Sequence, residues 1–338
     1  MNKLVVFFLF LFVFSCLTFA FENVVVVSYP EEEQVNTVIK DCKNHKEKIK
    51  KLEDFALKSY NNNQYNLALY AYDKLLSFKK NSKRKEFSYY MVSGDIYCLN
   101  NNYFLGIEMY KKALSIYRKN EEINIKIANL YLRNNVYELA QEFFNDVLKN
   151  NKNSIDAKKG LGNLFYLQNR YQKAIFYYEQ LDFLHVDKDT ILKMADSYTN
   201  LNDISKAIKI LEKYAENTES FEILLFLGQL YIENNEYVKA KKLFLNLHKN
   251  HSNNFKVCLY LANVYDLLGE TSLSKHMLEL SYKINSSYCT TDILQAKVAY
   301  KLGYISQAKK YAHNALAKAK TVFLRNQAHK CLNFLQNK

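Results

Sequence analysis

Small residues recur about every 34 positions along this chain, each time twelve positions ahead of a second small residue. The first series comprises Ala56, Gly94, Ala128, Gly162, Ala195, Gly228, Ala262 and Ala296. The second series comprises Ala68, Gly106, Ala140, Ala174, Ala207, Ala240, Ser274 and Ala308. Two helices that cross closely need small residues where their backbones approach. The paired series therefore predicts eight antiparallel helix pairs.

Residues that end helices stand between the two members of each pair. They include Asn61–Asn63, Asn100–Asn102, Asn134, Asn135, Asn169, Asn202, Asn234, Asn235, Gly269 and Gly303. Asn and Gly tolerate the left-handed backbone conformation that commonly closes a helix. Aromatic residues keep a fixed register with these turns, as Tyr65, Tyr103, Tyr137, Tyr171 and Tyr237 show. We interpret most of the 28 tyrosines as core residues that pack beside the small ones.

The composition favours an all-α fold. The 338 residues include one proline and seven glycines, which is too few for a turn-rich β structure. Leu, Ala, Lys and Glu are abundant, and these residues form helices readily.

The small-x-x-Tyr pattern, followed by Tyr-x-x-Ala and an aromatic four residues later, resembles the tetratricopeptide repeat (TPR) family. Ala128 with Tyr131, and Tyr137 with Ala140 and Phe144, carry one copy of it. The resemblance implies an all-α, right-handed α-solenoid of about eight antiparallel helix pairs with capping helices. The repeats are expected over residues 49–319, with approximate starts at 49, 87, 121, 155, 188, 221, 255 and 289. Residues 21–48 are expected to form a linker with a capping or coiled-coil helix, and residues 320–338 a C-terminal capping helix.

The N-terminus reads as an export signal. Met1-Asn2-Lys3 precedes an apolar run that closes on Thr18-Phe19-Ala20, which predicts a signal peptide over residues 1–20. Two alternatives stay open: residues 4–21 kept as a membrane anchor, or lipidation at Cys16. Each places the remaining chain outside the cytoplasm, so an exported TPR protein of bacterial type, in the periplasm or another extracytoplasmic space, is expected.

The resemblance also implies where a ligand binds, because the first helix of each pair lines the concave groove in this family. The position after each small residue of the first series then faces a partner. Asp95, Asn129, Asn163, Asp196, Gln229 and Asn263 occupy it in repeats two to seven, and Lys159 stands beside Asn163. Amides can donate to and accept from the main chain of an extended peptide, so these residues are the predicted peptide-binding set.

Positive charge is concentrated at the C-terminal end. Of the formal net charge of +13, residues 289–338 hold nine Lys or Arg against one acid, Asp292. This end could contact an anionic membrane or an acidic protein. Carboxylates along the predicted groove disfavour nucleic acid as a partner.

No motif for catalysis, cofactor binding or metal binding occurs in the sequence, since glycine-rich phosphate loops, H-E-x-x-H and G-x-S-x-G elements are missing. Cys42, Cys98, Cys258, Cys289 and Cys331 form no C-x-x-C pair, and their pairing stays open. We therefore predict an exported protein-interaction scaffold that is not an enzyme and binds a protein or peptide in its groove, within an envelope or secretion assembly. The alternative is a membrane-tethered or oligomeric adaptor that uses the basic C-terminal end. An enzyme, or its regulatory subunit, would need a buried titratable pair that the sequence does not display.

Overall fold

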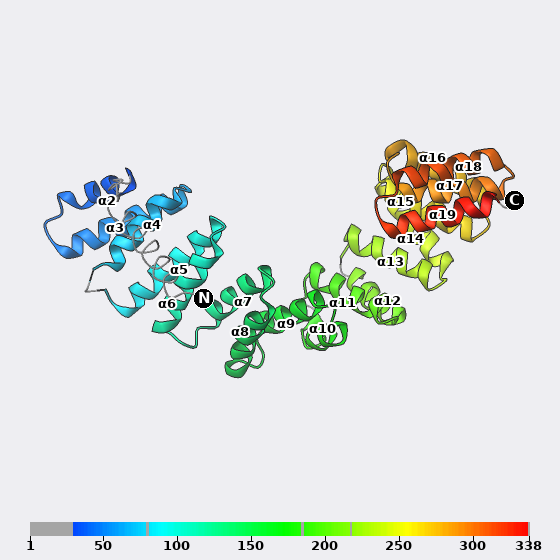
Figure 1. Cartoon of the computed structure of the whole chain (residues 1–338). Helices are drawn as coiled ribbons and strands as arrows, with labels where there is room; N and C mark the ends of the chain where they lie inside the picture. The colour runs from blue at the N-terminus through cyan, green and yellow to red at the C-terminus, as the bar shows by residue number, and fades with distance from the viewer. Residues whose placement is uncertain (1–29, 79–80, 184–185, 217, 337–338) are drawn as a thin grey trace, which may run out of the picture. The chain divides into compact units, whose positions relative to one another are not determined.

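The computed structural model describes residues 30–78, 81–183, 186–216 and 218–336 (Figure 1). These residues contain helices and no strand, so the predicted all-α fold class is confirmed. The predicted signal peptide, residues 1–20, lies outside the described residues. No helix in the described ranges has both the length and the apolar character needed to span a membrane.

The chain divides into two compact units, residues 1–152 and 153–338, which we call unit 1 and unit 2. Unit 1 contains α2 (Pro30–Lys40), α3 (His45–Asn61), α4 (Tyr65–Leu76), α5 (Lys83–Leu99), α6 (Tyr103–Ile116), α7 (Glu121–Arg133) and α8 (Tyr137–Asn150). Three helix pairs follow one another in it, α3 with α4, α5 with α6 and α7 with α8. Each pair packs on the next through its second helix.

Unit 2 contains five more pairs and a final helix. They are α9 (Ile155–Leu167), α10 (Tyr171–Tyr178), α11 (Lys188–Asn200), α12 (Ile204–Ala215), α13 (Phe221–Glu233), α14 (Tyr237–Asn250), α15 (Phe255–Leu267), α16 (Thr271–Ile284), α17 (Cys289–Lys301), α18 (Ile305–Lys318) and α19 (Val322–Gln336). The pairs are α9 with α10, α11 with α12, α13 with α14, α15 with α16 and α17 with α18. First helices of neighbouring pairs also touch, as α15 touches α17.

Helix starts follow from local capping. The helices α7, α9, α11, α13, α15 and α17 begin at the residues expected for repeat starts, whereas α3 and α5 begin earlier than residues 49 and 87. The side chain of Asn44 accepts a hydrogen bond from the Glu47 backbone N–H at 2.9 Å, which fixes the start of α3. Ser82 caps α5 in the same way.

The turns inside the pairs depend on a repeated Asn–Tyr contact. Six asparagines, Asn63, Asn101, Asn135, Asn169, Asn202 and Asn235, have φ between 57° and 62°, and Gly269 and Gly303 take a similar role with φ of 80° and 81°. In five of the asparagine turns, a tyrosine two residues later donates its hydroxyl to the asparagine Oδ1, as Tyr137 does to Asn135 at 3.0 Å. The turn residue and the aromatic that opens the second helix therefore act together.

Among the first six pairs, every second one has a glycine at the helix crossing. In the second, fourth and sixth pairs, the small residue of the first helix is glycine, and an aromatic ring sixteen residues later lies against it. A Cβ added at Gly94 would lie 2.5 Å from Cε1 of Tyr110, and equivalent additions would overlap Tyr178 at Gly162 and Phe244 at Gly228. The other pairs carry alanine at this position. Over the first six pairs the glycine contact thus recurs with a period of two pairs, twice the single repeat, and the eighth pair carries Ala296 instead.

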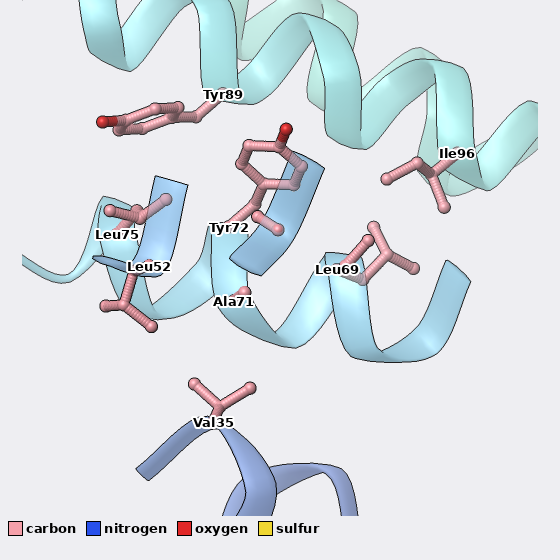
Figure 2. Packing of buried hydrophobic residues seen from close by; sticks show 10 residues of the cluster. Val35, Leu52, Leu69, Ala71, Tyr72, Leu75, Tyr89 and Ile96 are labelled. Carbon is pink, nitrogen blue, oxygen red and sulfur yellow. The ribbon is translucent and has the colours of Figure 1, made fainter. Parts of the chain in front are cut away.

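Both ends are covered by an extra helix. In unit 1, Val35 of α2 is fully buried against the first pair, and Figure 2 shows it pointing toward Ala71 of α4. In the described part of residues 21–48, α2 ends at Lys40 and α3 begins at His45. In unit 2, α19 packs on α17 and α18 and buries Ala328, Leu332 and Leu335.

Candidate functional site

Several predicted groove residues hold neighbouring repeats together. In unit 1, Asp95 of α5 accepts hydrogen bonds from the Tyr110 hydroxyl at 2.5 Å and from Lys126 Nζ of the next repeat at 2.6 Å. Burial is the larger cause and the bond to Asp95 the smaller one, and both raise the pKa of the Tyr110 phenol. The hydroxyl therefore stays a neutral donor. Although burial acts in the opposite direction, the Asp95 carboxylate raises the pKa of Lys126. Asp95 is thus committed to internal contacts.

The same arrangement recurs in unit 2. Asn163 accepts from the Tyr178 hydroxyl at 2.9 Å and from Lys193 Nζ at 3.2 Å. In the sixth repeat, Gln229 donates to the hydroxyl of Tyr260, again from the following repeat. These ties occur in the pairs that carry glycine at the crossing. Because Gly162 has no Cβ, the Tyr178 ring packs directly against its backbone, and the Tyr178 hydroxyl can reach Asn163.

Two more predicted residues are also engaged. Asp196 accepts from the Tyr166 hydroxyl at 2.7 Å, and Lys159 pairs with Asp187 at 2.5 Å. Burial raises the pKa of Asp187, but the bonds from Lys159 and Thr190 outweigh it and leave the pKa lowered. Asp187 also caps α11, so this contact is structural.

Asn129 and Asn263 differ from the rest of the predicted set. Neither side chain has a hydrogen-bond partner among the residues that the structure describes. Asn129 is exposed on α7 of unit 1. Asn263, half-buried on α15, lines a hollow of about 530 Å³ in unit 2. An unpaired amide facing such a space is available to a ligand.

This hollow, the C-terminal hollow, is built by three helices. Its lining is Leu259, Tyr260 and Asn263 from α15, Thr290, Ile293, Leu294 and Lys297 from α17, and Gln327 and Lys330 from α19. Leu259 precedes Asn263 by four residues, and Ile293 precedes Lys297 by four, so each helix turns one face into it. The predicted groove position, directly after each small residue of the first series, gives Asn263 and also Lys297, which follows Ala296, whereas the other lining residues were not predicted. The four-residue spacing from the predicted position would have located Leu259 and Ile293.

A buried carboxylate orders the cationic side of the hollow. Asp266 of α15 has a fully buried side chain, and its Oδ1 accepts from Lys301 Nζ at 2.5 Å. Lys297 Nζ lies 3.0 Å from Oδ2 of the same group without hydrogen-bond geometry, and it is half exposed. Two lysines therefore share one carboxylate. Lys330 has no acidic partner among the described residues, so the hollow carries excess positive charge.

The basic C-terminal end is only partly available to a partner. Lys318 of α18 pairs with Asp292 at 2.7 Å, and the Asp292 side chain is fully buried. Nζ of Lys318 also lies 4.8 Å from the centroid of the Tyr282 ring. Lys309 and Lys310 make no ion pair within the described ranges. Lys318 thus joins α17 to α18 and is a poor candidate for membrane contact.

Groups for redox or metal chemistry are dispersed. In the described ranges, no three His, Cys, Asp or Glu side chains are placed to share a metal ion, and the five cysteines are free thiols. Burial raises the pKa of Cys258 and of Cys331, which keeps both protonated.

Family models described as tetratricopeptide repeat match residues 125–182 and 189–217. No curated protein sequence matches the chain.

Solved structures of TPR proteins resemble it at low identity. YrrB, described as a TPR protein with an unusual peptide-binding site, is 18% identical with a TM-score of 0.49 over 56% of this chain and 97% of YrrB. MamA is 20% identical with a TM-score of 0.43, covering 48% of this chain and 91% of MamA. A tetratricopeptide repeat protein from Parabacteroides merdae ATCC 43184 is 15% identical with a TM-score of 0.39, covering 86% of this chain and 99% of its own. The likeness is confined to the fold.

Helix pairs joined by asparagine turns, small residues at each crossing and two family matches lead to one conclusion. The chain carries tetratricopeptide repeats over residues 125–182 and 189–217, and such repeats support a scaffold for protein interactions.

Proposed function

We propose that this chain is an exported scaffold that binds a segment of a partner protein in the C-terminal hollow. The observation that carries the proposal is the combination of an unpaired amide, Asn263, with an apolar floor and a cationic rim in one open space. Asn163 and Gln229 have comparable positions in their repeats, but their side chains are already bonded. The hollow is therefore the part of the predicted groove best suited to a ligand.

A library of random twelve-residue peptides tests the proposal. We expect the full chain to enrich a peptide family, and a fluorescein-labelled member to bind about tenfold more weakly to Asn263→Ala/Ile293→Ala, since the pair removes an amide contact and part of the apolar floor. Asn246→Ala is the matched control, because Asn246 is an exposed amide on α14, outside the hollow. Equal affinity in the parent and the double variant, measured by fluorescence anisotropy, would remove the hollow as the binding site.

The proposal places the scaffold outside the cytoplasm, in an envelope or secretion assembly. The basic start and apolar run of residues 1–20 support export, whether the segment is cleaved, lipidated or kept as an anchor. N-terminal sequencing of the protein from fractionated native cells measures this. A new N-terminus at Phe21, or recovery with the membrane, agrees with export. Intact chain in the soluble cytoplasm contradicts it.

A further inference from the structure

We infer that the C-terminal hollow takes an acidic, apolar segment, in which side-chain carboxylates stand between two apolar residues. This inference rests on the proposed function and names the class of partner. It follows from the charge of the lining, from the exposed face of α19 and from the length of that face.

The charge of the hollow is one-sided. Lys297 and Lys330 line it, and no acidic side chain does. Asp266, beneath the surface, is shared by Lys297 and Lys301, so it cannot neutralise both. A cation that is half exposed beside an apolar floor lies in a lower effective dielectric than bulk water, which strengthens its attraction for a carboxylate. Carboxylates are the complementary groups.

The face of α19 that borders the hollow adds apolar contacts at both ends. Gln327 and Lys330 line the hollow, and Phe323 and Phe334 stand four residues before and after them, on the same stripe of the helix. Phe323 is 68% exposed and Phe334 is 51% exposed. Phe334 packs edge-on against Tyr300 of α17, with ring centroids 5.1 Å apart, which fixes its orientation. Exposed phenylalanines around a cation suit a ligand with apolar residues around an acid.

The length of this stripe sets the spacing of the ligand. Phe334 lies eleven positions after Phe323, which corresponds to about 16 Å along a helix axis. An extended peptide covers that distance in about five residues. Two apolar anchors five positions apart, with carboxylates between them, therefore match the stripe.

Defined probes test the inference. The probe is an acetylated and amidated octapeptide of serines with two leucines five positions apart and two glutamates between them. Its counterparts carry glutamine or lysine in place of glutamate, or serine in place of leucine. We expect the full chain to bind the glutamate peptide at least tenfold more tightly than the glutamine or serine versions, and to bind the lysine version least. A glutamate peptide with a free C-terminal carboxylate should bind less than twofold more tightly than the amidated one, because the hollow recognises side-chain carboxylates.

Charge reversal locates the effect. Lys330→Glu should weaken binding of the glutamate peptide about tenfold and strengthen binding of the lysine peptide. Lys310→Glu makes the same charge change on α18, outside the hollow, and should alter binding less than twofold. Equal losses in the two variants, or equal affinity for the glutamate and lysine peptides, overturn the inference. If the random library enriches peptides without acids, only the inference fails. If it enriches nothing, the proposed function fails as well.

Discussion

Gly162→Ala is expected to destabilise unit 2 by about 2–3 kcal/mol, because the new methyl group would overlap the ring of Tyr178. The ring cannot move aside easily, since Tyr178 is 2% exposed and its hydroxyl is bonded to Asn163. Hydrogen exchange, followed peptide by peptide in the full chain, should show amides of α9 and α10 exchanging roughly 30- to 150-fold faster. Amides of α18 and α19 should change least, because repeat proteins transmit stability mainly to neighbouring repeats.

A second substitution tests the cause. Tyr178→Leu alone leaves a cavity over Gly162 and should destabilise the pair. Added to Gly162→Ala, it recreates the combination that the chain uses at Ala195 and Leu211, where both residues are fully buried. The double variant should therefore be more stable than the sum of the two single effects predicts, with a coupling of about 1–2 kcal/mol. Simple additivity of the two changes would rule out the ring-on-glycine contact.

The helix pairs were predictable because each depends on few and local requirements. A small residue at each crossing and an asparagine or glycine in each turn can be read from spacing alone, and Ala128, Ala140 and Asn135 illustrate all three positions. The alternation between pairs was not predicted. Glycine and alanine count alike as small residues, and only coordinates reveal that Tyr178 occupies the volume of a missing Cβ at Gly162.

The site was harder to predict because register fixes which face a residue occupies and not whether its polar atoms are already bonded. Asn163 and Asn263 are equivalent in sequence position. In the structure, Asn163 bonds Tyr178 and Lys193, whereas Asn263 faces the hollow unpaired. The difference depends on Tyr178, 15 positions away in the same pair, and on Lys193, 30 positions away in the following one. Lys330 lies still farther along, on a helix outside the repeat pattern.

Lys318→Met is expected to destabilise the C-terminal end by about 3–5 kcal/mol at neutral pH, because it leaves a buried carboxylate without its counter-ion. The Asp292 side chain is fully buried, and Lys318 Nζ lies 2.7 Å from its Oδ2. The other oxygen, Oδ1, has no hydrogen-bond partner among the described residues, so nothing there replaces the lysine. Methionine retains the length and apolar stem of the side chain, which isolates the effect of the charge.

The dependence on pH has a definite sign. Burial raises the pKa of Asp292, and Lys318 opposes that rise. A carboxyl whose folded-state pKa is raised stabilises the fold below its unfolded pKa, near 4, and this stability is lost as pH rises through the folded-state value. The neighbouring Cys289 and Tyr311 have pKa values raised by burial, so they stay neutral in this range. The deficit of Lys318→Met should therefore be small near pH 4 and full at pH 7.

Asp292→Asn/Lys318→Met is the reference for that measurement, since it removes the titrating group and the cation together. Replacing both members of a buried ion pair by neutral groups of similar volume is often close to neutral, in contrast to removal of one member. At pH 7 we expect the double variant to recover most of the stability that Lys318→Met loses. This site should then contribute no change in the free energy of unfolding between pH 4 and 7. Urea unfolding of the parent and both variants across this range, with exchange of α17 and α18 as the local readout, decides the matter. If the difference in free energy of unfolding between the single and double variants stays constant with pH, a buried charge is not the cause.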